Sequence, residues 1–173
     1  MNKKQKILFS TEDINKRVKE LGQQVSKDYE GKKLVVVSLL RGSFIFAADL
    51  VREIGIPTQI EFITTASYGH NEESSGQVEI INDIKDDIEG RDVLVVDDIM
   101  DTGLTMEKII EHLKKKNPNS IKSCVMLDKP ERRKTEITPD YVGFTIPDLF
   151  IVGYGLNYGD YYRNIPYIFS FVD

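Results

Sequence analysis

One stretch, residues 93–105, constrains the fold of this chain more than any other. It begins with four apolar residues in a row, continues through the adjacent carboxylates Asp97 and Asp98, and ends in a polar turn ahead of an amphipathic segment. An uninterrupted apolar run is typical of a parallel strand covered on both faces. We therefore predict a buried strand over residues 91–97, followed by a turn and a helix over residues 104–116.

The turn after this strand has the composition of an anion site at the start of a helix. The N–H groups of a first helical turn have no partner within the helix, and the helix dipole favours a negative charge beside them. No Lys or Arg lies between Asp97 and Thr105, so main-chain amides and threonine hydroxyls would hold the anion.

The two carboxylates would repel a phosphate and therefore need a different partner. Acidic side chains accept hydrogen bonds from the vicinal hydroxyls of a ribose, and Mg²⁺ prefers oxygen ligands. Side chains alternate along a strand, which places Asp97 and Asp98 on opposite faces and argues against a carboxylate dyad at one site. Together, the acids and the turn predict a ribose-phosphate site.

Strands that alternate with helices predict an α/β fold with a central, mostly parallel sheet flanked by helices. Ser10 and Asp13 form a predicted helix cap, and apolar residues recur behind them at helical spacing. The predicted strands are residues 34–40, 58–68, 78–82 and 121–127, and a helix covers residues 43–54. Short apolar pieces at 141–145, 150–155 and 167–172 would join residues 8–9 in a small subdomain over the strand ends.

Composition narrows the class of protein. With 173 residues the chain suits one domain, and a net charge of −5 argues against a nucleic-acid surface. No apolar stretch reaches the roughly 18 residues that a membrane span needs, and the first residues do not form a secretory signal. Cys124 is the only cysteine and is predicted to be a small buried hydrophobe. We expect a disulfide-free cytoplasmic protein without a membrane or nucleic-acid partner.

The run from Asp97 to Thr105 resembles the phosphoribosyl-pyrophosphate signature of type I phosphoribosyltransferases. A strand that ends in two acids also suits a receiver domain or a nucleoside triphosphatase. A receiver domain would lack the Thr-Gly-x-Thr turn, and a nucleoside triphosphatase would need a Gly-rich Lys-Ser/Thr loop that is absent from this sequence. The resemblance implies that Asp97 and Asp98 position the ribose hydroxyls, directly or through Mg²⁺, and that Asp101 is the general base near purine N7. It assigns the ribose 5′-phosphate to Met100, Asp101, Thr102, Gly103, Leu104 and Thr105.

Further segments resemble the 6-oxopurine branch of this family. Leu40, Arg41 and Gly42 resemble the pyrophosphate loop, in which the peptide before the basic residue is often cis. Arg163 resembles a residue directed at pyrophosphate, while Ser67 and Tyr68 begin a segment that resembles a mobile loop over the reaction centre.

The same resemblance assigns the purine pocket. It implies that Lys129 donates to purine O6, that Phe150 stacks on the base, and that the Ile151 carbonyl faces C2. Asn157 belongs to this segment and departs from the pattern, because most relatives carry there an Asp that helps hold a metal. We expect weaker Mg²⁺ binding at Asn157. The nearby Arg132, Arg133 and Lys134 are predicted to be solvated surface charge.

The resemblance covers most of the chain and implies a single phosphoribosyltransferase domain over residues 1–173. Its core would span residues 11–128, and a hood would form from the N-terminal residues and residues 129–173. The implied activity is purine salvage, which makes inosine or guanosine monophosphate and pyrophosphate from phosphoribosyl pyrophosphate and hypoxanthine or guanine, with Mg²⁺ as cofactor. A dimer or tetramer is expected. Alternatives are a xanthine-accepting enzyme, an RNA-binding regulator on the same fold, and a noncatalytic nucleotide sensor.

Overall fold

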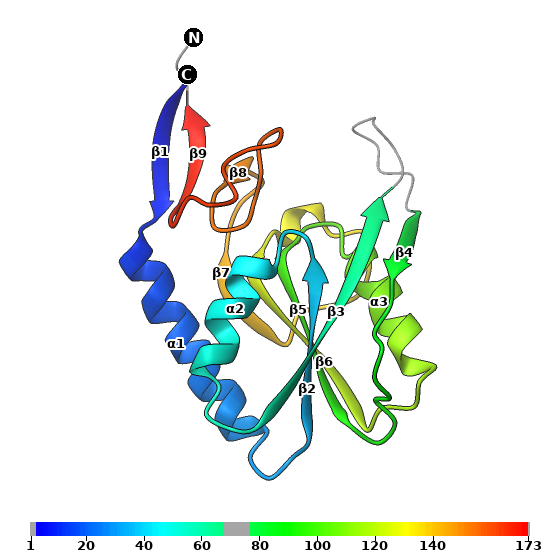
Figure 1. The fold of residues 1–173 in the computed structure, drawn as a ribbon. Coiled ribbons are helices and arrows are strands. Elements are labelled where there is room, and N and C mark those ends of the chain that lie inside the picture. The colour runs from blue at the N-terminus through cyan, green and yellow to red at the C-terminus, as the bar shows by residue number, and fades with distance from the viewer. Residues whose placement is uncertain (1–2, 68–76, 173) are drawn as a thin grey trace.

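The computed structural model describes residues 3–67 and 77–172, which form a six-stranded sheet between helices and a separate three-stranded sheet (Figure 1). The larger sheet has the order β4-β3-β2-β5-β6-β7, and only β4 runs antiparallel to its neighbour. Its strands are β2 (Leu34–Leu40), β3 (Thr58–Ser67), β4 (Val78–Asn82), β5 (Asp92–Met100), β6 (Ser120–Asp128) and β7 (Tyr141–Thr145). The predicted α/β fold with a mostly parallel sheet is confirmed.

Helices cover both faces of this sheet. Helices α1 (Thr11–Asp28) and α2 (Phe44–Glu53) lie on one face, and α3 (Leu104–Lys114) lies on the other (Figure 1). A hydrophobic core lies on each face of the sheet, and alternate residues of β2 and β5 point into one core or the other. Val36 packs with α1 and α2, whereas Val37 packs with α3. Because both faces are covered, residues 34–37 of β2 and 93–96 of β5 are apolar in consecutive positions rather than in every second one.

Helix α1 begins where the sequence predicted. The Ser10 side chain accepts a hydrogen bond from the Asp13 N–H, and the Asp13 carboxylate accepts one from the Ser10 N–H. This reciprocal cap satisfies two amides that would otherwise have no partner. One stripe of the helix, which includes Ile14 and Leu21, is buried against the sheet.

The two ends of the chain meet in the smaller sheet. Strand β1 (Lys4–Phe9) pairs antiparallel with β9 (Ile168–Val172), which pairs with β8 (Ile151–Val152). We call these three strands the hood sheet. The Phe9 ring stacks on the ring of Phe144 from β7 at a centroid distance of 4.0 Å, which joins the hood sheet to the edge of the larger sheet. The prediction that both termini share one subdomain is confirmed, but residues 141–145, which were predicted to join it, form β7 of the larger sheet because they pair with β6.

Two predicted strands differ most from the structure. Strand β5 continues through Met100 instead of ending at Asp97, because β6 is equally long and pairs with it as far as Asp128. Only Ile151 and Val152 of the predicted strand 150–155 are extended, since residues 153–156 turn back on themselves. Within the described residues no helix is long and apolar enough to cross a bilayer.

Candidate active site

Three of the predicted segments lie at neighbouring strand ends. Residues 40–42 lie at the end of β2, residues 101–105 follow β5, and Lys129 follows β6. These three strands are adjacent and parallel. The Lys129 N–H donates to the Met100 carbonyl at 2.9 Å, which closes the gap between the last two segments. In open α/β sheets ligands bind at this edge, where loops and helix N-termini converge.

The phosphate loop, residues 101–105, is a tight turn into α3. Gly103 caps the helix in the left-handed conformation, with φ 83°, and its carbonyl accepts the Glu107 N–H. The Asp101 carboxylate accepts the Thr102 N–H at 2.6 Å, and the Thr102 hydroxyl accepts the Leu104 N–H at 3.4 Å. The start of α3 therefore presents its first-turn amides at the sheet edge, as an anion site requires.

A second segment, residues 133–135, packs directly over this loop. Arg133 Nε donates to the Asp101 carbonyl at 3.1 Å, and the Lys134 N–H donates to the Thr102 carbonyl at 2.9 Å. A Cβ on Gly103 would lie 2.3 Å from Thr135 Oγ1. The prediction that Arg133 is solvated was wrong, because its side chain is 14% exposed and also pairs with Asp128.

The two acids of β5 are half-buried and interact with each other. The Asp97 carboxylate accepts the Asp98 N–H at 2.9 Å, and the Asp98 carboxylate accepts the Ile99 N–H at 2.8 Å. Burial and the charge of Asp98 raise the pKa of Asp97 well above its ordinary value. Burial also raises the pKa of Asp98, while Arg163 opposes that rise. The two carboxylates thus influence one another although they are adjacent along the strand, and their predicted placement on opposite faces stays a prediction.

This donor set fits a divalent cation. Two neighbouring carboxylates whose charges disfavour one another are stabilised by a positive ion between or beside them, and carboxylate oxygen is a ligand that Mg²⁺ prefers. Among the described residues no group of three His, Cys, Asp or Glu side chains is arranged to hold a metal. An ion at Asp97 and Asp98 would therefore take the rest of its oxygen ligands from substrate and water.

The end of β2 lies close against Asp98 because the neighbouring positions are glycines. The peptide bond between Leu40 and Arg41 is cis, as in the loop that it resembles. A Cβ on Gly42 would lie 2.1 Å from the Asp98 carboxylate, and one on Gly155 would lie 2.3 Å from the Gly42 carbonyl. Arg163 Nη1 donates to the Gly155 carbonyl at 2.6 Å. Glycines at both positions thus let three backbone segments meet at Asp98.

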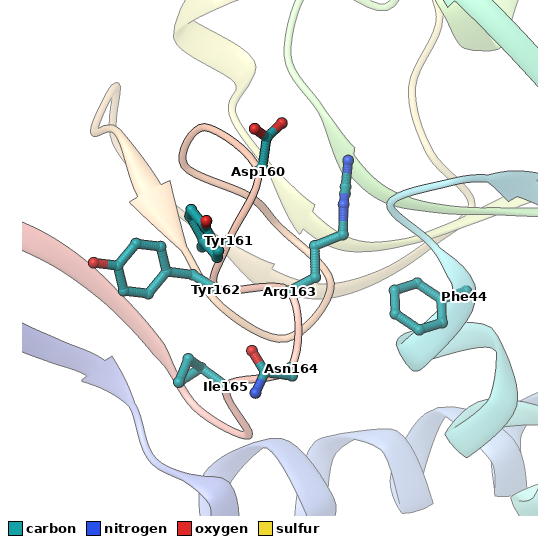
Figure 2. Close-up of a pocket in the computed structure, with 7 residues that line it drawn as sticks. All are labelled: Phe44, Asp160, Tyr161, Tyr162, Arg163, Asn164 and Ile165. Carbon is teal, nitrogen blue, oxygen red and sulfur yellow. The ribbon is translucent and has the colours of Figure 1, made fainter.

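A cavity of about 520 Å³ lies beside this meeting point, lined by Phe44 at the start of α2 and by residues 160–165 (Figure 2). In Figure 2 the Arg163 side chain extends away from Tyr162, whose ring lies against those of Phe169 and Phe171. Arg163 is half-buried, and its positive charge acts to lower the pKa of Asp98. The structure thus brings Arg163 to the same side as residues 40–42.

Of the residues assigned to the purine, Lys129 is linked through Asp148 to the segment that carries Phe150 and Ile151. Its side chain is 10% exposed, and its ammonium lies 3.6 Å from the Asp148 carboxylate. Phe150 follows two residues later and is 61% exposed, with its ring 5.8 Å from that of Tyr158. Phe150 is therefore not a core residue and is available as a stacking surface. Ile151 is buried in β8.

Two predicted residues make no described contact with these segments. Asn157 is exposed, and its side-chain amide donates to the Gly159 carbonyl at 2.7 Å. Ser67 is the last residue of β3, while Tyr68 and the segment after it lie outside the described residues. The mobile loop therefore stays a prediction.

Sequence reasoning missed the residues that support the site, namely Arg133, Thr135, Asp148 and Gly155. Each contacts a segment far away in the chain, and Arg133, Thr135 and Asp148 do not stand out from their sequence neighbours. Only Gly155 carried a signal, because glycines before and after Tyr154 indicate close backbone packing.

Comparison with known proteins identifies the family. Residues 4–159 match the model of the phosphoribosyl transferase domain. The chain is 49% identical to the hypoxanthine-guanine phosphoribosyltransferase of Aquifex aeolicus, over 99% of this chain and 97% of that protein. It is 47% identical to the hypoxanthine phosphoribosyltransferase of Buchnera aphidicola, over 94% and 93%.

Solved structures agree. A hypoxanthine phosphoribosyltransferase from Staphylococcus aureus superposes with a TM-score of 0.93 at 46% identity, over 96% of this chain and 91% of that one. A hypoxanthine-guanine phosphoribosyltransferase from Bacillus anthracis gives 0.93 at 47% identity, over 99% and 100%. The strand-end geometry and these matches lead to one conclusion: this chain belongs to the phosphoribosyltransferase family of enzymes.

Proposed function

We propose that this enzyme transfers the 5-phosphoribosyl group of phosphoribosyl pyrophosphate to hypoxanthine or guanine in purine salvage. The products are inosine or guanosine monophosphate and pyrophosphate. The observation that carries this proposal is the convergence of an acid pair, a helix-start anion loop and a buried lysine at the ends of the adjacent strands β5 and β6. The names of the relatives at 47–49% identity support the same substrates.

In this proposal three sets of residues bind three parts of phosphoribosyl pyrophosphate. The amides of Thr102, Gly103, Leu104 and Thr105 bind the 5′-phosphate, with Met100 and Asp101 at the edge of the same loop. Asp97 and Asp98 accept hydrogen bonds from the ribose hydroxyls. The backbone at Leu40, Arg41 and Gly42 and the guanidinium of Arg163 face the pyrophosphate, whose charge Arg163 complements.

Mg²⁺ is the cofactor that we propose, held by Asp97 and Asp98 together with substrate oxygens. When bound, it would offset the negative charge that builds up on the departing pyrophosphate. The carboxylate pair supports this assignment, because burial and mutual repulsion raise the pKa of Asp97 in the absence of a cation. Asn157 offers a neutral oxygen instead of a carboxylate, and we expect it to add little to metal binding.

Asp101 is the proposed general base for the proton at purine N7. Its carboxylate is half-buried and accepts the Thr102 N–H, which orients it within the loop. Asp101→Asn keeps an oxygen for that hydrogen bond but cannot take a proton. We expect kcat to fall about 10²- to 10⁴-fold while the substrate KM values change little. An unchanged kcat with raised KM values would contradict the role as base.

Lys129 is the proposed selector of the base. Its buried ammonium donates hydrogen bonds and accepts none, so it matches the oxygen at C6 of hypoxanthine and guanine and opposes the amino group of adenine. Asp148, at 3.6 Å, keeps this charge compensated when no base is present. Phe150 stacks on the purine, and the Ile151 carbonyl lies at its C2 edge.

One assay tests the proposal. The protein is incubated with Mg²⁺, phosphoribosyl pyrophosphate and, separately, hypoxanthine, guanine, xanthine or adenine, and the nucleotide product is measured. We expect product from the first two, little from adenine, and loss of activity when Mg²⁺ is chelated. Product from xanthine at a comparable rate would favour the xanthine-accepting alternative. No product with any base, together with tight RNA binding on filters, would favour the regulatory alternative.

Two further properties are proposals. The cytoplasm is the proposed compartment, supported by a single cysteine, Cys124, that is buried as a free thiol. A dimer or tetramer is the proposed assembly, which light scattering of the purified protein would test.

A further inference from the structure

Arg133 is bound on three sides. Its Nε donates to the Asp101 carbonyl at 3.1 Å, its Nη1 donates to the Ile137 carbonyl at 2.8 Å, and its Nη2 pairs with the Asp128 carboxylate. The side chains of Arg133 and Asp128 are 14% and 11% exposed. A fork of donors that reaches three acceptors in fixed directions is a property of arginine that lysine cannot reproduce.

Two of these acceptors belong to the proposed substrate sites. Asp101 opens the phosphate loop, and Asp128 is the last residue of β6, immediately before Lys129. Arg133 therefore connects the loop that would hold the 5′-phosphate with the strand end that carries the lysine for the purine. A buried charge pair contributes little net stability compared with apolar residues of the same size, so its use here points to orientation.

Each of residues 133–135 donates a hydrogen bond to a carbonyl oxygen of the phosphate loop. Besides Arg133, the Lys134 N–H donates to the Thr102 carbonyl at 2.9 Å, and the Thr135 hydroxyl donates to the same oxygen at 3.5 Å. Carbonyl oxygens repel a phosphate. With those of Asp101 and Thr102 held by donors on this side, the carbonyl oxygens are kept away from the proposed anion site at the start of α3.

We propose that Arg133 is a positioning residue that holds the phosphate loop in its anion-binding form by binding the Asp101 carbonyl. The inference rests on the proposed function and adds to it a residue that does not touch the substrate. The proposal predicts a selective effect. Loss of the Arg133 hydrogen bonds weakens binding of the 5′-phosphate and leaves the contacts with ribose and base intact.

The test compares inosine monophosphate with inosine, which lacks only the phosphate. Dissociation constants for both are measured calorimetrically for the wild type and for Arg133→Lys, which keeps the charge beside Asp128 but loses the fork. We expect the affinity for the nucleotide to fall about tenfold and that for the nucleoside to change less than about twofold. A purely structural role would lower the melting temperature without changing this ratio in the folded protein.

Two further variants keep the test decisive. Lys134→Gln removes a positive charge from the same segment while its N–H stays in place, and neither affinity should change by more than about twofold. Thr135→Val removes only the weaker contact with the Thr102 carbonyl and should lower nucleotide affinity about two- to threefold, which serves if Arg133→Lys does not fold.

Each failure has a distinct signature. If Arg133→Lys lowers the affinities for nucleotide and nucleoside equally, or changes neither affinity, the positioning role is refuted while the wild-type activity stands. If the wild type itself does not bind inosine monophosphate more tightly than inosine, the proposed function fails instead.

Discussion

The contact between Gly103 and residues 133–135 makes a quantitative prediction about stability. Gly103 has φ 83°, and a Cβ there would lie 2.3 Å from Thr135 Oγ1 and 3.0 Å from Arg133 Cδ. Gly103→Ala therefore incurs two costs. The left-handed conformation costs an alanine about 1–2 kcal/mol, and overpacking in a filled region costs about 1–3 kcal/mol. We expect a loss of about 3.5 kcal/mol in the free energy of unfolding.

Gly31 provides a matched control, because it has φ 75° and nothing within 4 Å of the position of a Cβ. Gly31→Ala incurs only the conformational cost, about 1.5 kcal/mol. At about 2–4 °C per kcal/mol for a chain of this size, thermal unfolding should show a fall of about 3–6 °C for Gly31→Ala and about 7–14 °C for Gly103→Ala. Adding Thr135→Ala to Gly103→Ala should recover part of the difference.

Equal losses at the two glycines would refute the reasoning, since they would show that the phosphate loop has room for a methyl group. So would a Gly103→Ala protein whose stability is unaffected by the second substitution at Thr135. The same protein should also bind inosine monophosphate more weakly, because the loop must move to admit the new side chain.

Three other predictions concern single side chains. Arg17 donates to the Val142 and Gly143 carbonyls at 2.6 and 2.9 Å, so Arg17→Met should cost about 2 kcal/mol in urea unfolding, and no loss would show that water replaces both bonds. Phe150→Ala should leave stability within about 0.5 kcal/mol but weaken hypoxanthine binding about tenfold by calorimetry, and unchanged binding would remove Phe150 from the purine site. The pKa of Asp97 is raised in the folded state, so the wild type loses stability as the pH rises from the unfolded-state pKa of this carboxyl towards its folded-state pKa. Asp97→Asn should therefore be more stable than the wild type at about pH 7, with the difference closing near pH 4, and a difference that is equal at both pH values would contradict this linkage.

The elements that the sequence predicted well are those whose pattern is local. Residues 34–40 and 141–145 match β2 and β7 at both ends, because their apolar runs are bounded by turn residues. The end of β5 could not be predicted in this way. Asp98 and its neighbours are polar or mixed, and they remain extended because β6 continues alongside them.

The same distinction applies to the site. The acids, the phosphate loop and Lys129 each follow an apolar strand, so their position at the sheet edge follows from the order of elements. Arg133 shows what sequence reasoning cannot reach. Arg132, Arg133 and Lys134 look alike in the sequence, and only the path of the chain after β6 decides that one guanidinium turns inward to the Asp101 carbonyl.

The pairing of β1 with β9 has a consequence for the way the molecule is assembled. Strand β1 precedes the six-stranded sheet in the chain and its partner β9 follows it, so their pairing joins two segments that are separated by the whole of that sheet. Contacts between such distant segments form late, because the loss of chain entropy is recovered only once the intervening part is compact. The six-stranded sheet can thus form before β1 is paired, and β1 keeps an unpaired edge until β9 has been synthesised.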